Sequence, residues 1–97
     1  MKQKEIIHLL SEYKKENSEK YGITDLGLFG SIARNQYNEN SDIDICIKIK
    51  EPNPFIIVHI KSDIEQIFNR DIDIIRIRET MNPYLKARID KEAIYVR

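Results

Sequence analysis

The segment Asp42–Lys50 constrains the fold most, because polar and apolar residues alternate along its whole length. Successive side chains of a β-strand point to opposite faces of a sheet, so this period of two predicts a strand. One face carries isoleucines and the other carries mainly polar residues: Ile43, Ile45, Ile47 and Ile49 against Asp42, Asp44, Cys46 and Lys48. The chain therefore contains a sheet strand with two aspartates on one face.

The segment before this strand predicts a helix, a strand and a short helix. Apolar residues at helical spacing indicate an amphipathic helix over about residues 3–20, which ends at Gly22. A short strand is expected over about residues 23–29. Ser31 is expected to cap a brief helix that runs through about Asn35.

The second half of the chain repeats the alternation of helices and strands. Asn53–Pro54 is a good N-cap and first turn for a helix through about Phe68. Its buried stripe is expected to comprise Ile57, Ile60, Ile64 and Ile67. A strand over 71–77, a helix that begins at Asn82–Pro83 with Leu85 and Ile89 facing inward, and a last strand over 93–96 are expected to follow. This order predicts an α/β (α+β) fold, with a single sheet layer covered by helices.

Composition excludes several classes of protein. The 97 residues suit one domain, 1–97, and a composition of 41% apolar and 33% charged residues is that of a globular protein. No stretch has the length of a membrane span or a secretion signal, so a cytoplasmic location is expected. Sixteen basic residues balance sixteen acidic ones, which argues against nonspecific nucleic-acid binding and leaves phosphate binding to local features.

Gly30 and Ser31 lie where the predicted strand 23–29 turns into the predicted short helix. Glycine lets the backbone approach a ligand closely, and the start of a helix points free N–H groups at that ligand. This turn is therefore a candidate anion site.

Three aspartates are candidate metal ligands and catalytic residues. Asp42 and Asp44 leave the same face of one strand, about 6.5–7 Å apart at the backbone. Asp73, on the strand 71–77, would add a third carboxylate if the two strands are neighbours. Carboxylates combined with substrate phosphates suit Mg²⁺, and two such ions can align an attacking oxygen, the α-phosphorus and the departing pyrophosphate.

The spacing of these motifs resembles a known signature. Gly30–Ser31 is followed, after ten residues, by Asp42-Ile43-Asp44, as in the polymerase-beta-like nucleotidyltransferase superfamily. Segments 28–34 and 41–45 are similar to its small prokaryotic branch, the minimal nucleotidyltransferases, and segments 71–75 and 82–85 extend the resemblance over nearly the whole chain.

The resemblance implies the fold of that superfamily and a role for each matching residue. Gly30 and Ser31 would hold the β- and γ-phosphates of ATP, and Asp42 and Asp44 would bind both Mg²⁺ ions. Asp73 would bind the catalytic ion and help to deprotonate the acceptor hydroxyl.

Two positions depart from the family pattern. Ile32 stands where many members have arginine, and Asn35 stands where they have glycine. We therefore expect Arg34 to carry more of the triphosphate contacts.

A chain of this size has little room to wall in an acceptor, so a partner protein is expected to present it. Minimal nucleotidyltransferases are commonly encoded beside a HEPN-domain protein, and the pair acts as a toxin–antitoxin system. The resemblance thus implies a type VII antitoxin that transfers AMP to a tyrosine of a HEPN toxin. The alternatives are a non-catalytic module that neutralises a partner by covering its surface, and transfer to a small molecule. Self-association is left open.

Overall fold

The computed structural model describes residues 1–97, which form four helices and four strands in alternation. In chain order these elements are α1 (Gln3–Tyr21), β1 (Ile23–Phe29), α2 (Gly30–Ala33), β2 (Ile43–Ile49), α3 (Pro54–Phe68), β3 (Ile72–Arg76), α4 (Pro83–Glu92) and β4 (Ile94–Tyr95). Each predicted helix and strand is thus present, with its ends shifted by a few residues at most. No helix combines the length and the apolar character that crossing a membrane requires.

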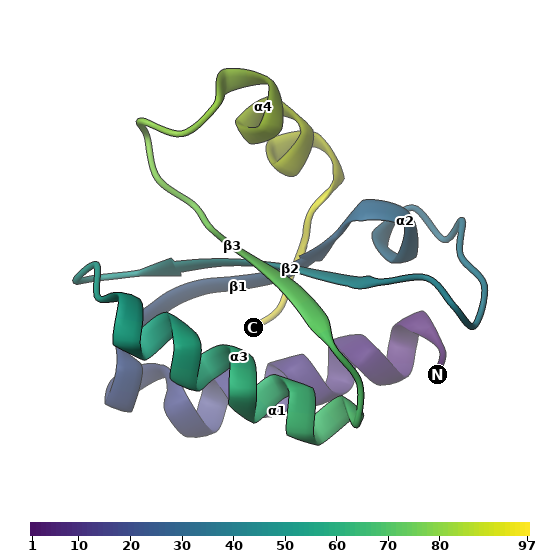
Figure 1. Ribbon diagram of the computed structural model, residues 1–97, viewed down its shortest axis with the longest axis horizontal. Coiled ribbons are helices and arrows are strands. Elements are labelled where there is room, and N and C mark those ends of the chain that lie inside the picture. Colours follow the sequence, from purple (N-terminus) through teal and green to yellow (C-terminus); the bar gives the residue numbers. More distant parts are fainter.

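The strands form one mixed sheet in the order β3-β2-β1-β4. Strand β1 runs antiparallel to both β2 and β4, whereas β2 and β3 are parallel and are connected through α3. Helices α1 and α3 lie side by side under one face of the sheet, and α4 arches over the other face (Figure 1). The predicted fold, a small mixed sheet covered by helices, is confirmed.

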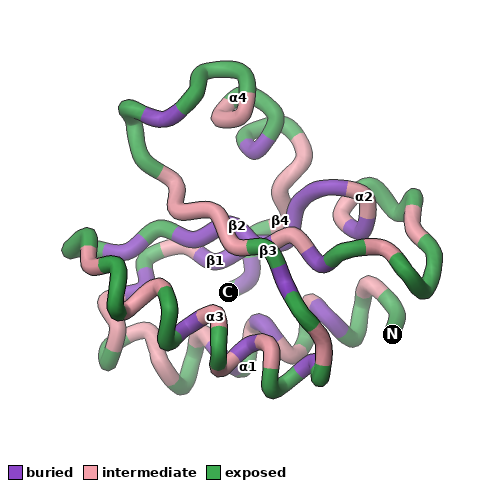
Figure 2. Tube along the Cα trace, in the orientation of Figure 1, coloured by how far each residue is buried: buried purple, intermediate pink, exposed green.

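The main core lies between the sheet and the helices α1 and α3. Burial along the chain follows the inward faces of these elements (Figure 2). The isoleucine face of β2 points into this core, as the alternation predicts. The sixteen buried members are Ile6, Leu10, Tyr13, Ile23, Leu26, Leu28, Ile32, Ile43, Ile45, Ile47, Ile49, Ile60, Ile64, Phe68, Ile72 and Val96.

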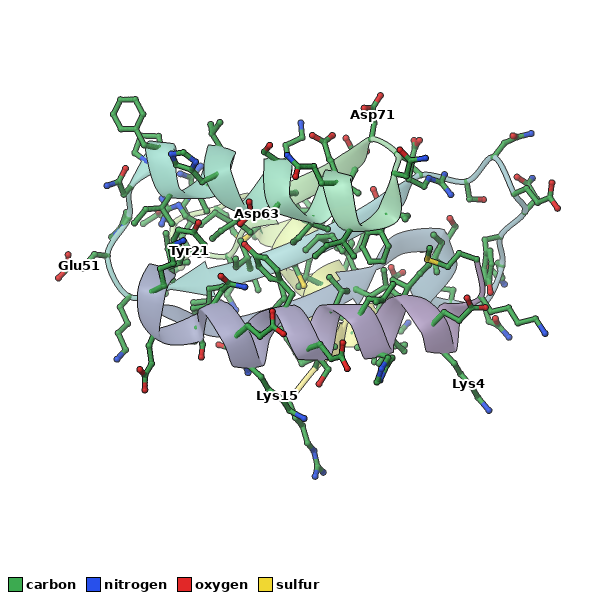
Figure 3. The ribbon with its side chains drawn as sticks, turned by 90° about the horizontal axis from the view of Figure 1, so that it is seen from below. Lys4, Lys15, Tyr21, Glu51, Asp63 and Asp71 are labelled. Carbon is green, nitrogen blue, oxygen red and sulfur yellow. The ribbon has the colours of Figure 1, made fainter.

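Helices α1 and α3 are also joined by hydrogen bonds to one carboxylate. The hydroxyls of Tyr13 and Tyr21, both on α1, donate to Asp63 Oδ2 on α3 at 2.7 and 3.4 Å. Figure 3 shows Tyr21 and Asp63 approaching each other between the two helices. Burial and the Asp63 carboxylate raise the pKa of Tyr13, so its hydroxyl keeps its proton and remains a donor.

A smaller apolar cluster supports α4 on the opposite face of the sheet. Its four buried members are Phe29, Cys46, Met81 and Ile89. Cys46 is fully buried here. The side chain of Asn82 accepts hydrogen bonds from the N–H groups of Tyr84 and Leu85, and α4 begins at Asn82–Pro83 as predicted.

Two local expectations were wrong. Helix α2 begins at Gly30 with Phe29 as its N-cap, so Ser31 lies inside the helix and does not cap it. On α3, Ile67 is 41% exposed, while Phe68 is buried in its place. The four-residue step from Ile60 to Ile64 continues to Phe68, because the helical repeat of 3.6 residues keeps residues four apart on one face.

Two isoleucines of α3 provide a matched test of this packing. Ile64→Ala is expected to lower the free energy of unfolding by about 2–5 kcal/mol, because it leaves a cavity in the core. Ile67→Ala should lower it clearly less, by about 1 kcal/mol, because Ile67 is partly exposed and its truncation leaves no closed cavity. Urea denaturation followed by circular dichroism measures both. Equal losses in the two variants would contradict the described orientation of α3.

Candidate active site

The turn between β1 and α2 brings the backbone of Gly30 against the side chain of Asp44. Gly30 has a φ of 78°, in the left-handed region that favours glycine. A Cβ added at Gly30 would overlap with Asp44 Oδ2 and would lie 3.1 Å from Asp44 Cγ. Glycine is therefore required here both for its backbone conformation and for the space that Asp44 occupies.

The register of the sheet places two of the predicted aspartates side by side. Asp44 on β2 is the neighbour of Phe29 on β1 and of Asp73 on β3. Both carboxyls therefore point to the sheet face that α4 covers, and they come within hydrogen-bonding reach when one of them carries a proton. The parallel pairing of β2 with β3, which the sequence left conditional, brings Asp73 to Asp44.

The pKa of Asp44 is shifted by its burial and by the neighbouring carboxyls. Burial, together with the nearby charges of Asp73 and Asp42, raises the pKa of Asp44 from 3.8 to about 6, although Arg34 opposes the shift. Burial disfavours the charged form and like charges oppose a second ionisation, so a cation beside these groups would favour their charged forms.

Asp42 lies one residue before β2 and is exposed. It is close enough to raise the pKa of Asp44, but no group of three His, Cys, Asp or Glu side chains forms a ready metal cage. The donor set is thus the Asp44–Asp73 pair with Asp42 at its margin. Such hard oxygen ligands fit Mg²⁺, which is usually held by one or two carboxylates, water and substrate phosphates.

Arg34, the predicted triphosphate contact, is bound to a carboxylate of α4. Its Nη1 lies 2.9 Å from Glu92 Oε2, and its Nε donates to Gln36 Oε1 at 3.3 Å. Its charge still reaches Asp44, whose pKa it lowers. Ser31 is half-buried in the short helix α2, next to Gly30.

A cavity of about 500 Å³ opens beside the two aspartates, and it contains residues that the sequence did not single out. Its lining includes Gly30, Asp44 and Asp73 together with Lys61 of α3 and Arg88 of α4. Both cations come from helices, where charged residues are commonly solvated. Only the tertiary structure shows that they face the carboxylate pair.

The raised pKa of Asp44 predicts a pH-dependent cost to stability. A carboxyl that binds its proton more tightly in the folded state loses stability as pH rises from its unfolded pKa, near 4, to about 6. In chelator-treated protein at pH 7.5, the free energy of unfolding of Asp44→Asn should therefore exceed that of the parent by on the order of 1–2 kcal/mol after allowance for solvent screening, with a correspondingly higher melting temperature. The difference should vanish near pH 3.5. Calorimetry across this pH range measures it, and a difference that does not change with pH would contradict the assignment.

The sequence matches the family model described as "Nucleotidyltransferase domain" over residues 10–96. A candidate protein adenylyltransferase of Methanocaldococcus jannaschii is 36% identical over 93 residues, which cover 95% of this chain and 95% of that protein. The protein adenylyltransferase MntA of Thermococcus cleftensis is 27% identical over 93 residues, which cover 95% of this chain and 93% of that protein.

Solved structures share the fold. A candidate minimal nucleotidyltransferase superposes with a TM-score of 0.79 at 24% identity, covering 97% of this chain and 95% of that one. A chain of the toxin–antitoxin pair MntA–HepT superposes with a TM-score of 0.68 at 15% identity, covering 95% of this chain and 69% of that one. The family model matches most of this chain, and the two relatives align with it over nearly their whole length. The chain therefore belongs to the nucleotidyltransferase domain family and is a homologue of the MntA-like protein adenylyltransferases.

Proposed function

We propose that this protein is a Mg²⁺-dependent enzyme that transfers AMP from ATP to a tyrosine hydroxyl of a HEPN-domain toxin, as the antitoxin of a type VII pair. The observation that carries the proposal is the meeting of Asp44 and Asp73 beside the Gly30 turn. This arrangement offers a metal-binding carboxylate pair next to a backbone that a phosphate can approach closely. Residues 1–97 would act as one catalytic domain in the cytoplasm.

Each element of the site has a role in the proposed reaction. The backbone at Gly30 and Ser31 would bind the β- and γ-phosphates, while Asp42, Asp44 and Asp73 would bind Mg²⁺. When bound, Mg²⁺ neutralises the charge that develops on the phosphates. Asp73, the exposed member of the pair, would orient the acceptor hydroxyl and help to take its proton. The acceptor oxygen would then form a bond to the α-phosphorus. The bond between that phosphorus and the pyrophosphate oxygen breaks, and pyrophosphate leaves.

Arg34 is proposed as a further triphosphate ligand that Glu92 holds in place. Pairing through Nη1 leaves donors of Nη2 unused, since a guanidinium has five N–H groups in a rigid plane. Arginine suits this role because its planar fork matches phosphate oxygens.

The choice of acceptor is supported by related proteins. The relatives include a candidate protein adenylyltransferase and the protein adenylyltransferase MntA. One of the structures that share the fold is described as a tri-AMPylated Shewanella oneidensis HEPN toxin in complex with its MNT antitoxin, and another as a toxin–antitoxin with AMP-PNP. A protein acceptor also agrees with the open cavity beside the two aspartates.

Transfer is tested by incubating the protein with labelled ATP, Mg²⁺ and the HEPN-domain toxin with which the proposal pairs it. The wild type should label a tyrosine of that protein, located by mass spectrometry. Asp42→Ala/Asp44→Ala and Asp73→Ala should each lower the rate by roughly 100-fold or more, because they remove groups that organise the transition state. Asp71→Ala is the matched control, since Asp71 is exposed and points away from the molecule (Figure 3).

The same experiment separates the alternatives. A double mutant that still neutralises the toxin without labelling it would support a non-catalytic module that covers the partner. Labelling of a small hydroxyl compound by the isolated chain, but never of the HEPN protein, would support a small-molecule transferase. Undiminished transfer by the double mutant would refute the assigned metal site.

A pair of glycine substitutions tests the contact between Gly30 and Asp44. Both Gly22 and Gly30 have positive φ, so alanine costs about 1–2 kcal/mol of stability at either position. At Gly22 the nearest atom to an added Cβ is 3.6 Å away, whereas at Gly30 the added Cβ displaces Asp44. Gly30→Ala should therefore lose transfer at temperatures where both variants are folded, while Gly22→Ala retains it. Equal activity of the two, measured as initial rates, would argue against the contact.

A further inference from the structure

The free edge of β3 and the adjacent flank of α3 form a groove that the proposed reaction does not use. Strand β3 is at the end of the sheet and pairs only with β2. A hollow of about 530 Å³ lies along it, lined by Pro54, Ile57 and Val58 of α3 and by Ile74, Arg76 and Arg78 on the strand side, with Pro52 and Asn53 at its end. Ile74 also lines the cavity of the aspartates, so the groove adjoins the candidate active site.

The backbone of β3 leaves hydrogen-bonding groups free along this groove. Ile77 N–H donates to Ile47 O at 2.7 Å, which fixes the odd-numbered residues of the strand as those bonded to β2. In a parallel pair the residues between them turn their N–H and C=O groups away from the partner strand. The N–H of Ile72 is taken by Glu65 Oε2 at 3.2 Å, so the open positions are Ile74 and Arg76.

The charged side chains that line the groove, Arg76 and Arg78, are both positive, although Arg78 also lines a neighbouring hollow with Asp25, Glu79 and Asp90. Arg76, Arg78 and Lys61, which stands where the groove meets the active site, form none of the salt bridges of the molecule. No carboxylate lines the groove itself, and those of the adjoining cavity, Asp44 and Asp73, belong to the metal site.

Exposed apolar side chains accompany these charges. Phe55 and Val58 on α3 are 77% and 66% exposed, although large apolar side chains are usually buried. Apolar surface next to a free strand edge and unpaired cations is suited to an extended segment whose residues alternate between acidic and apolar.

We propose that this groove, defined by Pro54, Ile57, Val58, Ile74, Arg76 and Arg78, docks an acidic extended segment of the acceptor protein. The segment adds a strand to β3 at Ile74 and Arg76, places carboxylates on Arg76, Arg78 and Lys61, and leads the acceptor hydroxyl to Asp73. The assignment of this segment to the acceptor rests on the proposed transfer of AMP to a protein. The docking of an acidic extended segment in the groove does not depend on that proposal.

Docking is tested without catalysis, using a short synthetic peptide of alternating glutamate and isoleucine and, for comparison, its lysine–isoleucine counterpart. Amide shifts in ¹⁵N-labelled wild-type protein should move at Ile74, Arg76 and Val58 with the acidic peptide only. Arg76→Glu/Arg78→Glu should weaken that binding by about tenfold or more and should instead bind the lysine peptide. Arg78→Glu, at an exposed position, should change the binding in the same direction and replaces the double variant if that variant does not fold.

Lys4→Glu/Lys15→Glu is the matched control, with the same change in net charge. Both lysines are exposed and extend from the outer side of α1, away from β3 (Figure 3). This variant should retain the affinity of the wild type for the acidic peptide. If this variant lost as much affinity for the acidic peptide as the arginine variant does, net charge alone would explain the effect and the proposal would be overturned.

The enzymatic experiment assigns the segment to the acceptor. With the HEPN-domain protein as acceptor, Arg78→Glu should raise the KM for that protein and leave the KM for ATP unchanged. If wild type transfers no AMP, the proposed function fails, while the peptide titration still reports on the groove.

Three outcomes would overturn the docking proposal. They are absence of shifts along β3, equal binding of the acidic and basic peptides, and shifts at β3 that depend on protein concentration without any peptide. The last outcome would assign the edge to a second copy of the chain.

Discussion

The site depends on one backbone constraint, the parallel pairing of β2 with β3. This register places Asp44 beside Asp73, so two carboxyls from segments far apart in sequence lie close together. Their repulsion and the burial of Asp44 raise the pKa of Asp44 to about 6. The sheet holds the two groups in place because the isoleucine face of β2 anchors the strand in the core. The core thus sustains an arrangement that, without a cation, is unfavourable at neutral pH.

Glycine and aspartate at this site are interdependent. Gly30 adopts a left-handed backbone conformation, and its missing side chain leaves the volume into which Asp44 extends. The signature that relates the Gly30–Ser31 turn to the Asp42–Asp44 strand therefore has a direct steric basis. Strands β1 and β2 are antiparallel neighbours, with Phe29 opposite Asp44, so the intervening loop returns the chain to the same point.

The sequence predicted the order of elements and put three aspartates forward as candidate site residues, but it did not show how the charges are paired. Alternation identified β2 because its pattern depends only on local geometry. The parallel contact of β2 with β3 is a long-range property, so the approach of Asp73 to Asp44 was only conditional. Lys61 and Arg88 have no distinctive local pattern, and the Arg34–Glu92 pair joins residues 58 positions apart. The error at Ile67 arose because isoleucine at nearly helical spacing was read as inward, whereas Phe68 completes the stripe.

The apolar clusters on the two faces of the sheet differ greatly in size. Sixteen buried residues join the sheet to α1 and α3, whereas only four support α4 on the other face. Local opening costs less where fewer apolar contacts must separate. Amide hydrogens of α4 should accordingly exchange with solvent through sub-global openings that leave the strands protected. The element that carries Arg88 and Glu92 should then open without global unfolding of the sheet.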